Sequence, residues 1–448
     1  MPYKKGQYKD GEKGSTYEVT AAKQENIENG IFNASMGVIN VKEAPFNAKG
    51  DGVTNDATAI NEALALAGVG GEETIVLLPL GSYACTSALK VPAKVRLIGQ
   101  HSHGTRLIAK GNINLIEVTE GNNTIEHLSM ESESKQASGS AIDLSHGFIQ
   151  NLTMADIKIG DNFFNGLFLV GNIENIGGIF GINIRFQNFN HSVKGYGNAA
   201  VVLGNGETNK RVNVVQFVNF CGQAAEAKDM PKWFEVNNTD TLQMSNVLMQ
   251  TGEKGLLIGN KDTSSKRSTN LEIATVVADG CTVTGYEIAS ALNGEMTSCH
   301  AEACGEGIVF SESVSDFNVI GGNYYANQGH GIRLQGSSAP GNSINISGAS
   351  IVDNGENAEA AKAGIFLAEK AGGLNVNGCT IGNPGGAGGG KQKVGITLGK
   401  KSENVGLYGN RFVGNVTSAV KKEGEEVKIN NKPAAEALAA IEAVNQMT

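Results

Sequence analysis

A short apolar motif recurs down most of this chain, and it constrains the fold more than any other feature. The motif has the form apolar–x–apolar, often after a glycine, as in Gly-Ile-Arg-Leu at 331 and Gly-Ile-Thr-Leu at 395. Successive copies start as little as 22 residues apart (285 to 307) and as much as 34 apart (166 to 200). The copies begin at residues 141, 166, 200, 233, 255, 285, 307, 331, 364 and 395.

Each copy is followed by further short segments with the same alternation, such as Ile344-Asn345-Ile346 and Leu374-Asn375-Val376. Asparagine often closes the unit, as at Asn327, Asn354 and Asn415. A period of two is typical of strands with one buried face. Strands this short cannot bury that face alone, but repeats stacked on one another bury it continuously. The sequence therefore predicts an all-β fold, a parallel β-helix solenoid over residues 37–430.

The composition supports this fold and excludes several function classes. The chain has 60 glycines for tight turns, a net charge of −9 and a pI of about 5.4, which disfavours nucleic acid and anionic membranes as partners. It has no apolar run long enough to span a bilayer. Its N-terminus has no apolar signal-peptide core, so we expect synthesis and folding in a cytosol. The six scattered cysteines contain no Cys-x-x-Cys, which predicts neither a metal site nor a cofactor.

Residues 39–99 carry a more specific pattern. The segment Ala48-Lys49-Gly50-Asp51-Gly52 precedes a predicted helix that carries Ile60 and Leu64 on one face, and the turn Pro79-Leu80-Gly81-Ser82-Tyr83 follows. This order resembles the opening of the pectate-lyase-like superfamily, which implies a right-handed parallel β-helix. The superfamily includes lyases, hydrolases, epimerases and phage tailspikes, so the resemblance implies a fold and leaves the reaction open. We interpret Gly50-Asp51-Gly52 as a structural turn.

Two terminal segments complete the predicted organisation. The pattern in residues 1–36 predicts a short amphipathic helix with Thr20 at its N-cap and Gly30 as its stop, and the segment resembles the leader of phage tail and baseplate proteins. Residues 431–448 predict a C-terminal helix with Pro433 near its start. Together the resemblances imply a homotrimeric phage tailspike or tail fibre that binds a bacterial surface polysaccharide. They also imply attachment to a phage tail or baseplate protein through residues 1–36, and a virion location after assembly in the host cytoplasm; an extracellular location is the alternative.

Carboxylates on the outward side of the repeat are the candidate catalytic groups. Cleavage of a polysaccharide needs either two carboxylates, as in hydrolysis, or a base beside a charge-neutralising group, and rungs about 4.8 Å apart give a spacing that suits a carboxylate pair. Glu235 and Glu287 fall two rungs apart on the first strand, or about 9.6 Å, and form the leading acid/base pair. Asp240 follows Glu235 and is a further candidate. The outward row contains residues 143, 168, 202, 235, 257, 287, 309, 333, 366 and 397.

A second carboxylate pair lies on the next strand of the repeat. Glu272 and Glu295 point outward on successive rungs, about 5 Å apart, and become the better candidates if a trimer axis covers the first row. The apolar residues in the first row predict such an oligomer contact. The candidate substrate-binding residues are Trp233, which would serve either as a sugar platform or in core packing, and His300 and Arg333.

Three functions are consistent with these patterns. The favoured one is a tailspike-like depolymerase of a bacterial surface polysaccharide; the others are a non-catalytic virion adhesin and a cellular polysaccharide lyase or hydrolase. Asn238-Thr239-Asp240 and Gly329-His330-Gly331 are similar to fragments of the polygalacturonase pattern, but the paired aspartates of that pattern are missing. We therefore interpret Gly329-His330-Gly331 as the start of a repeat.

Overall fold

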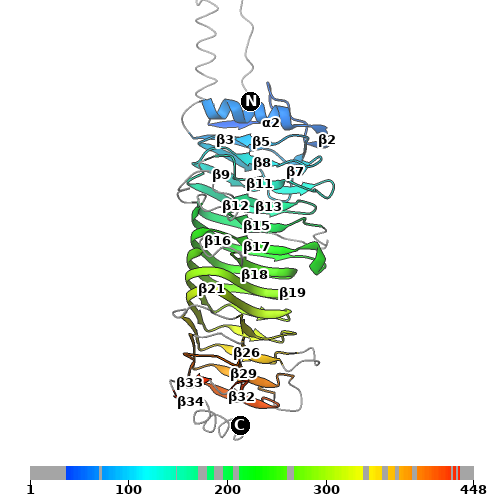
Figure 1. The fold of residues 1–448 in the computed structure, drawn as a ribbon. Helices are drawn as coiled ribbons and strands as arrows, with labels where there is room; N and C mark the ends of the chain where they lie inside the picture. The colour runs from blue at the N-terminus through cyan, green and yellow to red at the C-terminus, as the bar shows by residue number, and fades with distance from the viewer. Residues whose placement is uncertain are drawn as a thin grey trace, which may run out of the picture.

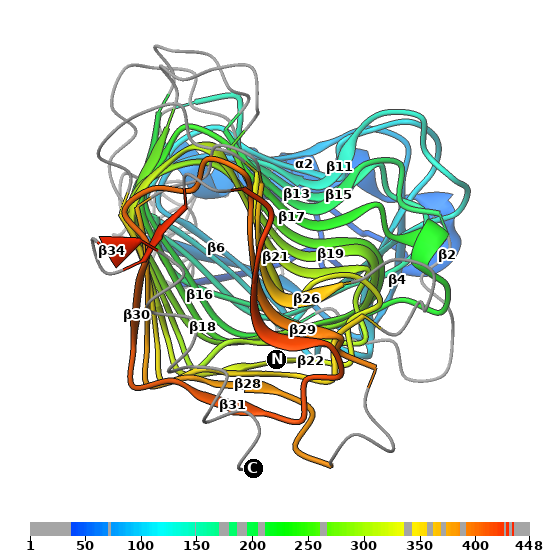
Figure 2. The same cartoon turned by 60° about the horizontal axis from the view of Figure 1, so that its bottom comes forward.

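A computed structural model describes most of the chain and shows one long solenoid of parallel strands. The chain advances along the axis from residue 37 at one end to residue 433 at the other (Figure 1). Seen closer to the axis, strands of successive rungs lie over one another (Figure 2). The described residues are 37–69, 73–147, 149–169, 179–185, 195–204, 211–259, 267–335, 343–355, 362–368, 373–385, 391–424, 427–429 and 432–433.

The solenoid has three faces, and the strands within each face pair in parallel. Each turn of the chain contributes a strand to the second face, then to the third face and then to the first face. The first face contains the predicted rung starts, of which those at 255, 285 and 307 lie in longer strands given below. Its short strands are β5 (Leu89–Val91), β8 (Ile116–Val118), β11 (Ser140–Asp143), β13 (Asn165–Leu169), β15 (Ala199–Leu203), β17 (Lys232–Val236), β23 (Ile332–Leu334), β26 (Ala363–Leu367), β29 (Val394–Leu398) and β32 (Ser418–Lys422).

The second and third faces are built from equally short strands. The second face contains β1 (Val38–Asn40), β3 (Thr74–Leu78), β6 (Val95–Gly99), β9 (Asn123–Glu126), β24 (Ile344–Ser347), β27 (Leu374–Asn377) and β30 (Gly406–Tyr408). The third face contains β2 (Asp51–Asn55), β4 (Gly81–Cys85), β7 (Thr105–Ala109), β10 (Ser129–Ser132), β20 (His300–Glu302), β22 (Asn323–Tyr325), β25 (Ser350–Val352), β28 (Thr380–Gly382) and β31 (Arg411–Val413).

In the middle of the solenoid, continuous strands run around the corners between faces. They pair in parallel with the rungs on either side, so the register passes unbroken from short strands to long ones. These strands are β12 (Leu152–Ile159), β14 (Ile179–Arg185), β16 (Val212–Gln223), β18 (Thr239–Ile258), β19 (Ser268–Thr297) and β21 (Glu306–Ile320).

One corner shows how the sequence encodes the bend between the second and third faces. A single residue in the left-handed backbone region turns the chain there in eight successive rungs, and asparagine and glycine adopt this region at low cost. Asn246 also donates its side-chain amide to Asn219 Oδ1 on the preceding rung, at 2.7 Å. The corner residues are Asn219, Asn246, Thr275, Ser298, Gly321, Gly348, Gly378 and Gly409, with φ between 50° and 64°.

Inward residues stack into apolar columns that form the core, as the alternation predicts. Ile308, Ile332, Ile365 and Ile396 pair in register on the first face, and all are 0% exposed. A row of buried polar side chains runs beside these apolar columns. It includes the asparagines predicted to close the repeat units. Its side chains hydrogen-bond from rung to rung, which satisfies amides that would otherwise destabilise the core; the row is Asn327, Asn354, Gln392 and Asn415.

The helix α2 (Ala57–Val69) covers the N-terminal end of the solenoid (Figure 1). Its predicted apolar face is buried, and Asn55 Oδ1 accepts the N–H of Ala57, its first residue. Asp56 is 1% exposed and accepts the backbone N–H groups of Lys49 and Gly50 at 2.6 and 2.9 Å. Gly50 and Gly52 hold left-handed φ values of 62° and 80°, but Asp51 and Gly52 belong to the irregular strand β2, so the predicted turn is instead the start of a bulged strand.

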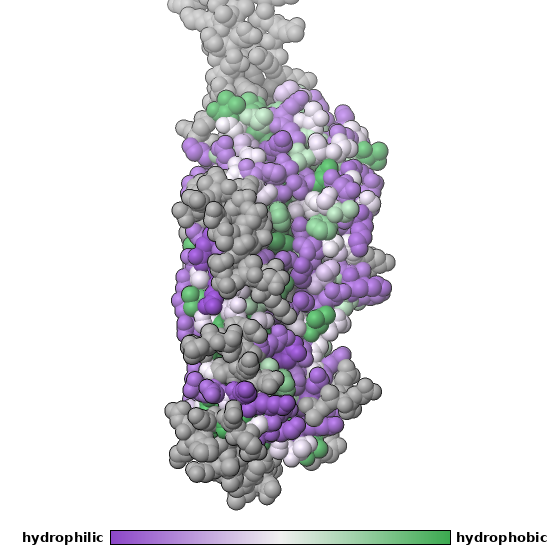
Figure 3. All heavy atoms as spheres, in the orientation of Figure 1, coloured by the Kyte–Doolittle hydropathy of each residue, from purple (hydrophilic) through white to green (hydrophobic). Residues whose placement is uncertain are grey.

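The surface in the orientation of Figure 3 is mainly hydrophilic with scattered apolar residues. The apolar outward residues Val202 and Val309 are only 4% and 1% exposed in the single chain. These two residues therefore do not need a partner subunit for their burial, which removes part of the sequence argument for a trimer.

The predicted terminal segments fall largely outside the described residues. This holds for all of residues 1–36 and for residues 434–448. Lys432 and Pro433, within the predicted C-terminal helix, instead form the short strand β34, which pairs with β33 (Lys428–Ile429). In the part of the chain that the structure describes, no helix is both long and apolar enough to cross a membrane.

Candidate functional site

The outward row of the first face has the register that the repeat predicts. Glu235 pairs with Leu257, Leu257 with Glu287, and Glu287 with Val309, so the two glutamates lie two rungs apart on one face. The same register continues through Arg333. The first predicted carboxylate pair is thus correctly placed along the solenoid axis.

Both of these glutamates are held in ion pairs with lysines. Glu235 contacts Lys232 Nζ at 2.5 Å and accepts a hydrogen bond from Asn237 at 3.2 Å. Glu287 contacts Lys254 Nζ at 2.7 Å, and its side chain is only 9% exposed. A carboxylate that is covered and charge-paired is poorly placed to reach a polymer, so this row has the features of a structural ion-pair network.

Trp233 does not present a ring to solvent. It is 0% exposed and packs edge-to-face on Phe220, with ring centroids 6.4 Å apart. The glycines Gly222 and Gly252 leave room for its indole, because a Cβ at Gly222 would lie 2.4 Å from a ring carbon. The sugar-platform interpretation of Trp233 is therefore wrong, and the core-packing alternative is correct.

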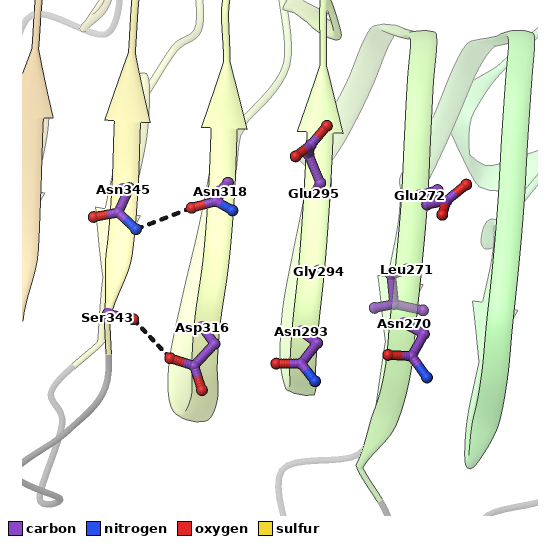
Figure 4. A pocket seen from close by; sticks show the side chains of 10 residues that line it. All are labelled: Asn270, Leu271, Glu272, Asn293, Gly294, Glu295, Asp316, Asn318, Ser343 and Asn345. Carbon is purple, nitrogen blue, oxygen red and sulfur yellow. Dashed lines mark hydrogen bonds between the residues drawn. The ribbon is translucent and has the colours of Figure 1, made fainter.

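The second carboxylate pair lines a groove on the second face, shown in Figure 4. Glu272 and Glu295 are both exposed and project from successive rungs of the continuous strand β19. The groove has a volume of about 560 Å³ and crosses four successive rungs. Apart from Leu271 and Gly294, its lining side chains are carboxylates, amides and one hydroxyl; the full lining is Asn270, Leu271, Glu272, Asn293, Gly294, Glu295, Asp316, Asn318, Ser343 and Asn345.

Two local features position the groove side chains. One is the alternation of inward and outward residues along each strand, and the other is the presence of short polar residues at a corner between faces. Glu272, Glu295, Asn318 and Asn345 occupy outward positions of their strands, between inward residues that are buried. Two residues earlier, Asn270, Asn293 and Asp316 hold left-handed φ values of 54°, 56° and 53° at another corner. Short polar side chains tolerate this backbone and leave their oxygens and amides at the surface.

Hydrogen bonds between rungs fix the orientation of the groove side chains. Gln243 donates to Glu272 Oε2 at 2.7 Å, and Asn345 donates to Asn318 Oδ1 at 2.9 Å. Within its own strand, Thr297 donates to Glu295 Oε1 at 2.9 Å. The two glutamates therefore have different partners, and no hydrogen bond joins them in Figure 4.

Asp240 lies at the border of the groove and holds one of its residues. Its Oδ1 accepts hydrogen bonds from Thr269 at 2.7 Å and from Asn270 at 2.8 Å, and Arg211 lies 3.8 Å away. Burial acts to raise the pKa of Asp240, but these hydrogen bonds and the Arg211 charge outweigh it and hold the pKa below its usual range. An aspartate that stays ionised and bonded in this way acts as an anchor for Asn270.

The structure does not bring His300 to this groove. It lies on the third face, beyond the corner at Ser298, where its Nδ1 is 3.2 Å from the Asn323 side-chain amide. On the same strand Glu302 hydrogen-bonds Tyr325 and raises the pKa of that phenol to about 12. His300 and the two groove glutamates therefore belong to different surfaces.

Sequence reasoning missed a half-buried carboxyl group next to Arg333. Glu306 accepts the backbone N–H of His330 at 2.9 Å, and partial burial raises the pKa of its carboxyl against the opposing charges of Arg333 and Lys362. Burial lowers the pKa of His330 to about 4, and its ring stacks on Phe366 at 4.6 Å. Glu306 immediately precedes a rung-start motif, and nothing in the motif itself marks that position as withdrawn from solvent.

The described residues contain no group of three or more His, Cys, Asp or Glu side chains able to hold a metal ion.

Two family matches cover most of the solenoid. Residues 38–209 match the family described as rhamnogalacturonase A/epimerase, pectate lyase-like, and residues 234–417 match the family described as right handed beta helix region. The first match begins at the predicted superfamily opening. A curated protein, the non-secreted LysM effector LysM19 of Penicillium expansum, is 44% identical over 63 residues, which span 14% of this chain and only 5% of that protein.

Solved structures with low sequence identity share the fold. Tailspike protein 3 of bacteriophage CBA120 gives a TM-score of 0.54 at 14% identity, over 95% of this chain and 65% of that one. The N-terminal fragment of bacteriophage phi29 gene product 12 gives 0.53 at 12% identity, over 91% and 75%. The A-module of the Azotobacter vinelandii mannuronan C-5 epimerase AlgE6 gives 0.51 at 17% identity, over 88% and 98%.

Proposed function

Starting from a right-handed parallel β-helix of the pectate-lyase-like type, whose fold phage tailspikes share, we propose that this protein binds and cleaves a bacterial surface polysaccharide in the second-face groove. The observation that carries the proposal is the presence of two exposed carboxylates, Glu272 and Glu295, on successive rungs of β19 within that groove. Side chains that donate and accept hydrogen bonds surround them, as recognition of a polyhydroxylated chain requires.

The chemistry proposed is hydrolysis of a glycosidic bond. Adjacent rungs lie about 4.8 Å apart, close to the roughly 5–5.5 Å between the two carboxyl groups of retaining glycosidases. Glu272, held across the rung by Gln243, is positioned to attack the anomeric carbon. Glu295, bonded to a hydroxyl of its own strand, is the group that protonates the leaving oxygen and then activates water.

The test is incubation of the purified chain with a panel of capsule, lipopolysaccharide and wall polymers, with products measured by mass spectrometry. Fragments that carry an added water identify a hydrolase, and fragments lighter by one water identify a lyase. Glu272→Gln and Glu295→Gln should each reduce cleavage by about a hundredfold or more. Glu62→Gln, an exposed position on α2 at the end of the solenoid, is the charge-matched control. Undiminished cleavage by both groove variants would contradict the site.

A non-catalytic adhesin is the second candidate. The row of linked amides favours it, since Asn375 donates to Asn345 at 2.9 Å beyond the end of the groove and extends a surface suited to binding alone. Binding of a polymer without any shortening would select this function. Secretion of the protein by a cell that degrades the same polymer would instead favour a cellular enzyme.

We also propose a virion location, a homotrimeric state and attachment to a phage tail or baseplate protein through residues 1–36. The fold likeness to tailspike protein 3 of bacteriophage CBA120 supports this proposal. Light scattering of the purified chain tests the trimer, and a monomeric mass would reject it. Deletion of residues 1–36 should abolish incorporation into particles and leave the β-helix folded.

A further inference from the structure

The charge of the groove restricts the kind of polymer that it can hold. Its described lining contains three carboxylates, those of Glu272, Glu295 and Asp316, and no lysine, arginine or histidine. All three are exposed, so they present their charge to whatever occupies the groove. A polyanionic chain would therefore meet three like charges within four rungs.

The two arginines at the border of the groove, Arg211 and Arg267, interact with residues beside the groove. Arg211 lies 3.8 Å from Asp240 and also donates to Thr269. Arg267 donates from Nη1 to Ser315 Oγ at 3.1 Å. Neither residue lines the groove, so the lining keeps its negative balance, and the net charge of −9 for the whole chain has the same sign.

The amides of the groove supply a different kind of recognition. Each asparagine side chain has two N–H donors and two acceptor lone pairs. The inter-rung bond between Asn318 and Asn345 uses one donor and one acceptor of this pair, which leaves further sites on both side chains for a ligand. The four rungs span about 14 Å along the solenoid axis, which is longer than a single sugar unit. Hydroxyl and acetamido groups of a linear glycan match such a row.

Resting on the proposed polysaccharide-binding function, we infer that the groove takes an uncharged polysaccharide rich in hydroxyl and acetamido groups, laid along the solenoid axis, and rejects polyuronates. This assignment separates the chain from proteins of the same fold whose names indicate uronate substrates, such as the mannuronan epimerase. It also favours hydrolysis, because elimination requires the acidic C–H next to a uronate carboxyl group and a cation to neutralise that carboxyl group.

The test is a binding titration of the full chain against three probes at low ionic strength: an oligosaccharide of N-acetylglucosamine, a neutral glucan oligosaccharide and oligogalacturonate. We expect binding of at least one neutral probe and no saturable binding of oligogalacturonate. Replacement of Asp316 by asparagine should strengthen any residual uronate binding by roughly fourfold, the Coulomb effect of one charge at about 5 Å in water. That gain should disappear at 1 M salt, where the Debye length is about 3 Å.

Oligogalacturonate binding that equals or exceeds that of the neutral probes would overturn the inference. If the oligogalacturonate were also cleaved, the depolymerase function would be supported and the uncharged substrate class would be rejected. Binding of a neutral probe would support the substrate class, and the polymer panel above decides separately whether the chain cleaves. Binding of none of the three probes would overturn the substrate class and leave the depolymerase function to that panel.

Discussion

Replacement of Glu287 by glutamine tests whether this carboxylate has a structural or a catalytic role. The Glu287 side chain is 9% exposed and lies 2.7 Å from Lys254 Nζ, whose side chain is 28% exposed. Breaking a fully buried ion pair from one side costs about 3–5 kcal/mol. Because Lys254 retains partial access to water, we expect Glu287→Gln to lower the free energy of unfolding by a smaller amount, about 2–3 kcal/mol. The more exposed pair of Glu235 with Lys232 should contribute about 1 kcal/mol or less.

The assay is urea unfolding at pH 7 followed by circular dichroism, with polysaccharide cleavage measured on the same preparations. A double-mutant cycle adds Lys254→Met, which removes the cation that Glu287→Gln leaves behind. The double variant should regain about 1–2 kcal/mol relative to additivity. Cleavage should remain near wild type in all folded variants, since Glu287 does not line the groove.

The opposite pattern would refute this reasoning. If Glu287→Gln unfolded at the wild-type urea concentration but lost cleavage, Glu287 would be a catalytic group. The predicted pair of Glu235 and Glu287 would then be the active pair, and the groove glutamates would be a solvated surface.

Three further predictions address the scaffold. Burial lowers the pKa of His330 from its usual 6.5 to about 4 in the folded chain, so the unfolded state binds more protons between these pH values. Stability should therefore fall by about 3 kcal/mol from pH 6.5 to pH 4, and His330→Gln should flatten this dependence in urea titrations. Asn354→Ala should lower the free energy of unfolding by about 3 kcal/mol, because it removes the acceptor of the buried Asn327 backbone N–H, one acceptor of its side-chain amide and a donor to Gln392; an unchanged urea midpoint would contradict the polar row. Trp233→Ala should cost about 3–5 kcal/mol and leave glycan affinity unchanged, whereas lost binding at unchanged stability would restore the sugar-platform interpretation.

The repeat made most of the fold predictable. The alternation around each rung start gave the inward and outward sides of the strands, and the pairing of Glu235, Leu257 and Glu287 follows from it. Superposition of equivalent positions on successive rungs is a property of any stacked repeat, so no tertiary information was needed. The same logic predicted Glu272 and Glu295 on successive rungs of the second face, where β19 carries both.

Local spacing did not predict the surroundings of single side chains. Trp233 shares an outward position with Glu235, yet glycines on adjacent strands open a space that buries its indole. Glu306 and His330 precede equivalent rung starts, and their burial depends on Phe366 and on a backbone contact between rungs. These contacts join residues 24 to 36 positions apart, which a period-two pattern cannot represent.

The sequence by itself therefore determined the architecture, the face of each strand and the rows of carboxylates, because these follow from a short-range alternation repeated along one axis. The tertiary structure alone decided which row can meet a polymer. Glu287 is covered and paired with a lysine of the preceding rung, whereas Glu272 and Glu295 border an open groove. An outward position specifies only a direction from the strand, and whether solvent or another side chain lies in that direction depends on neighbouring rungs.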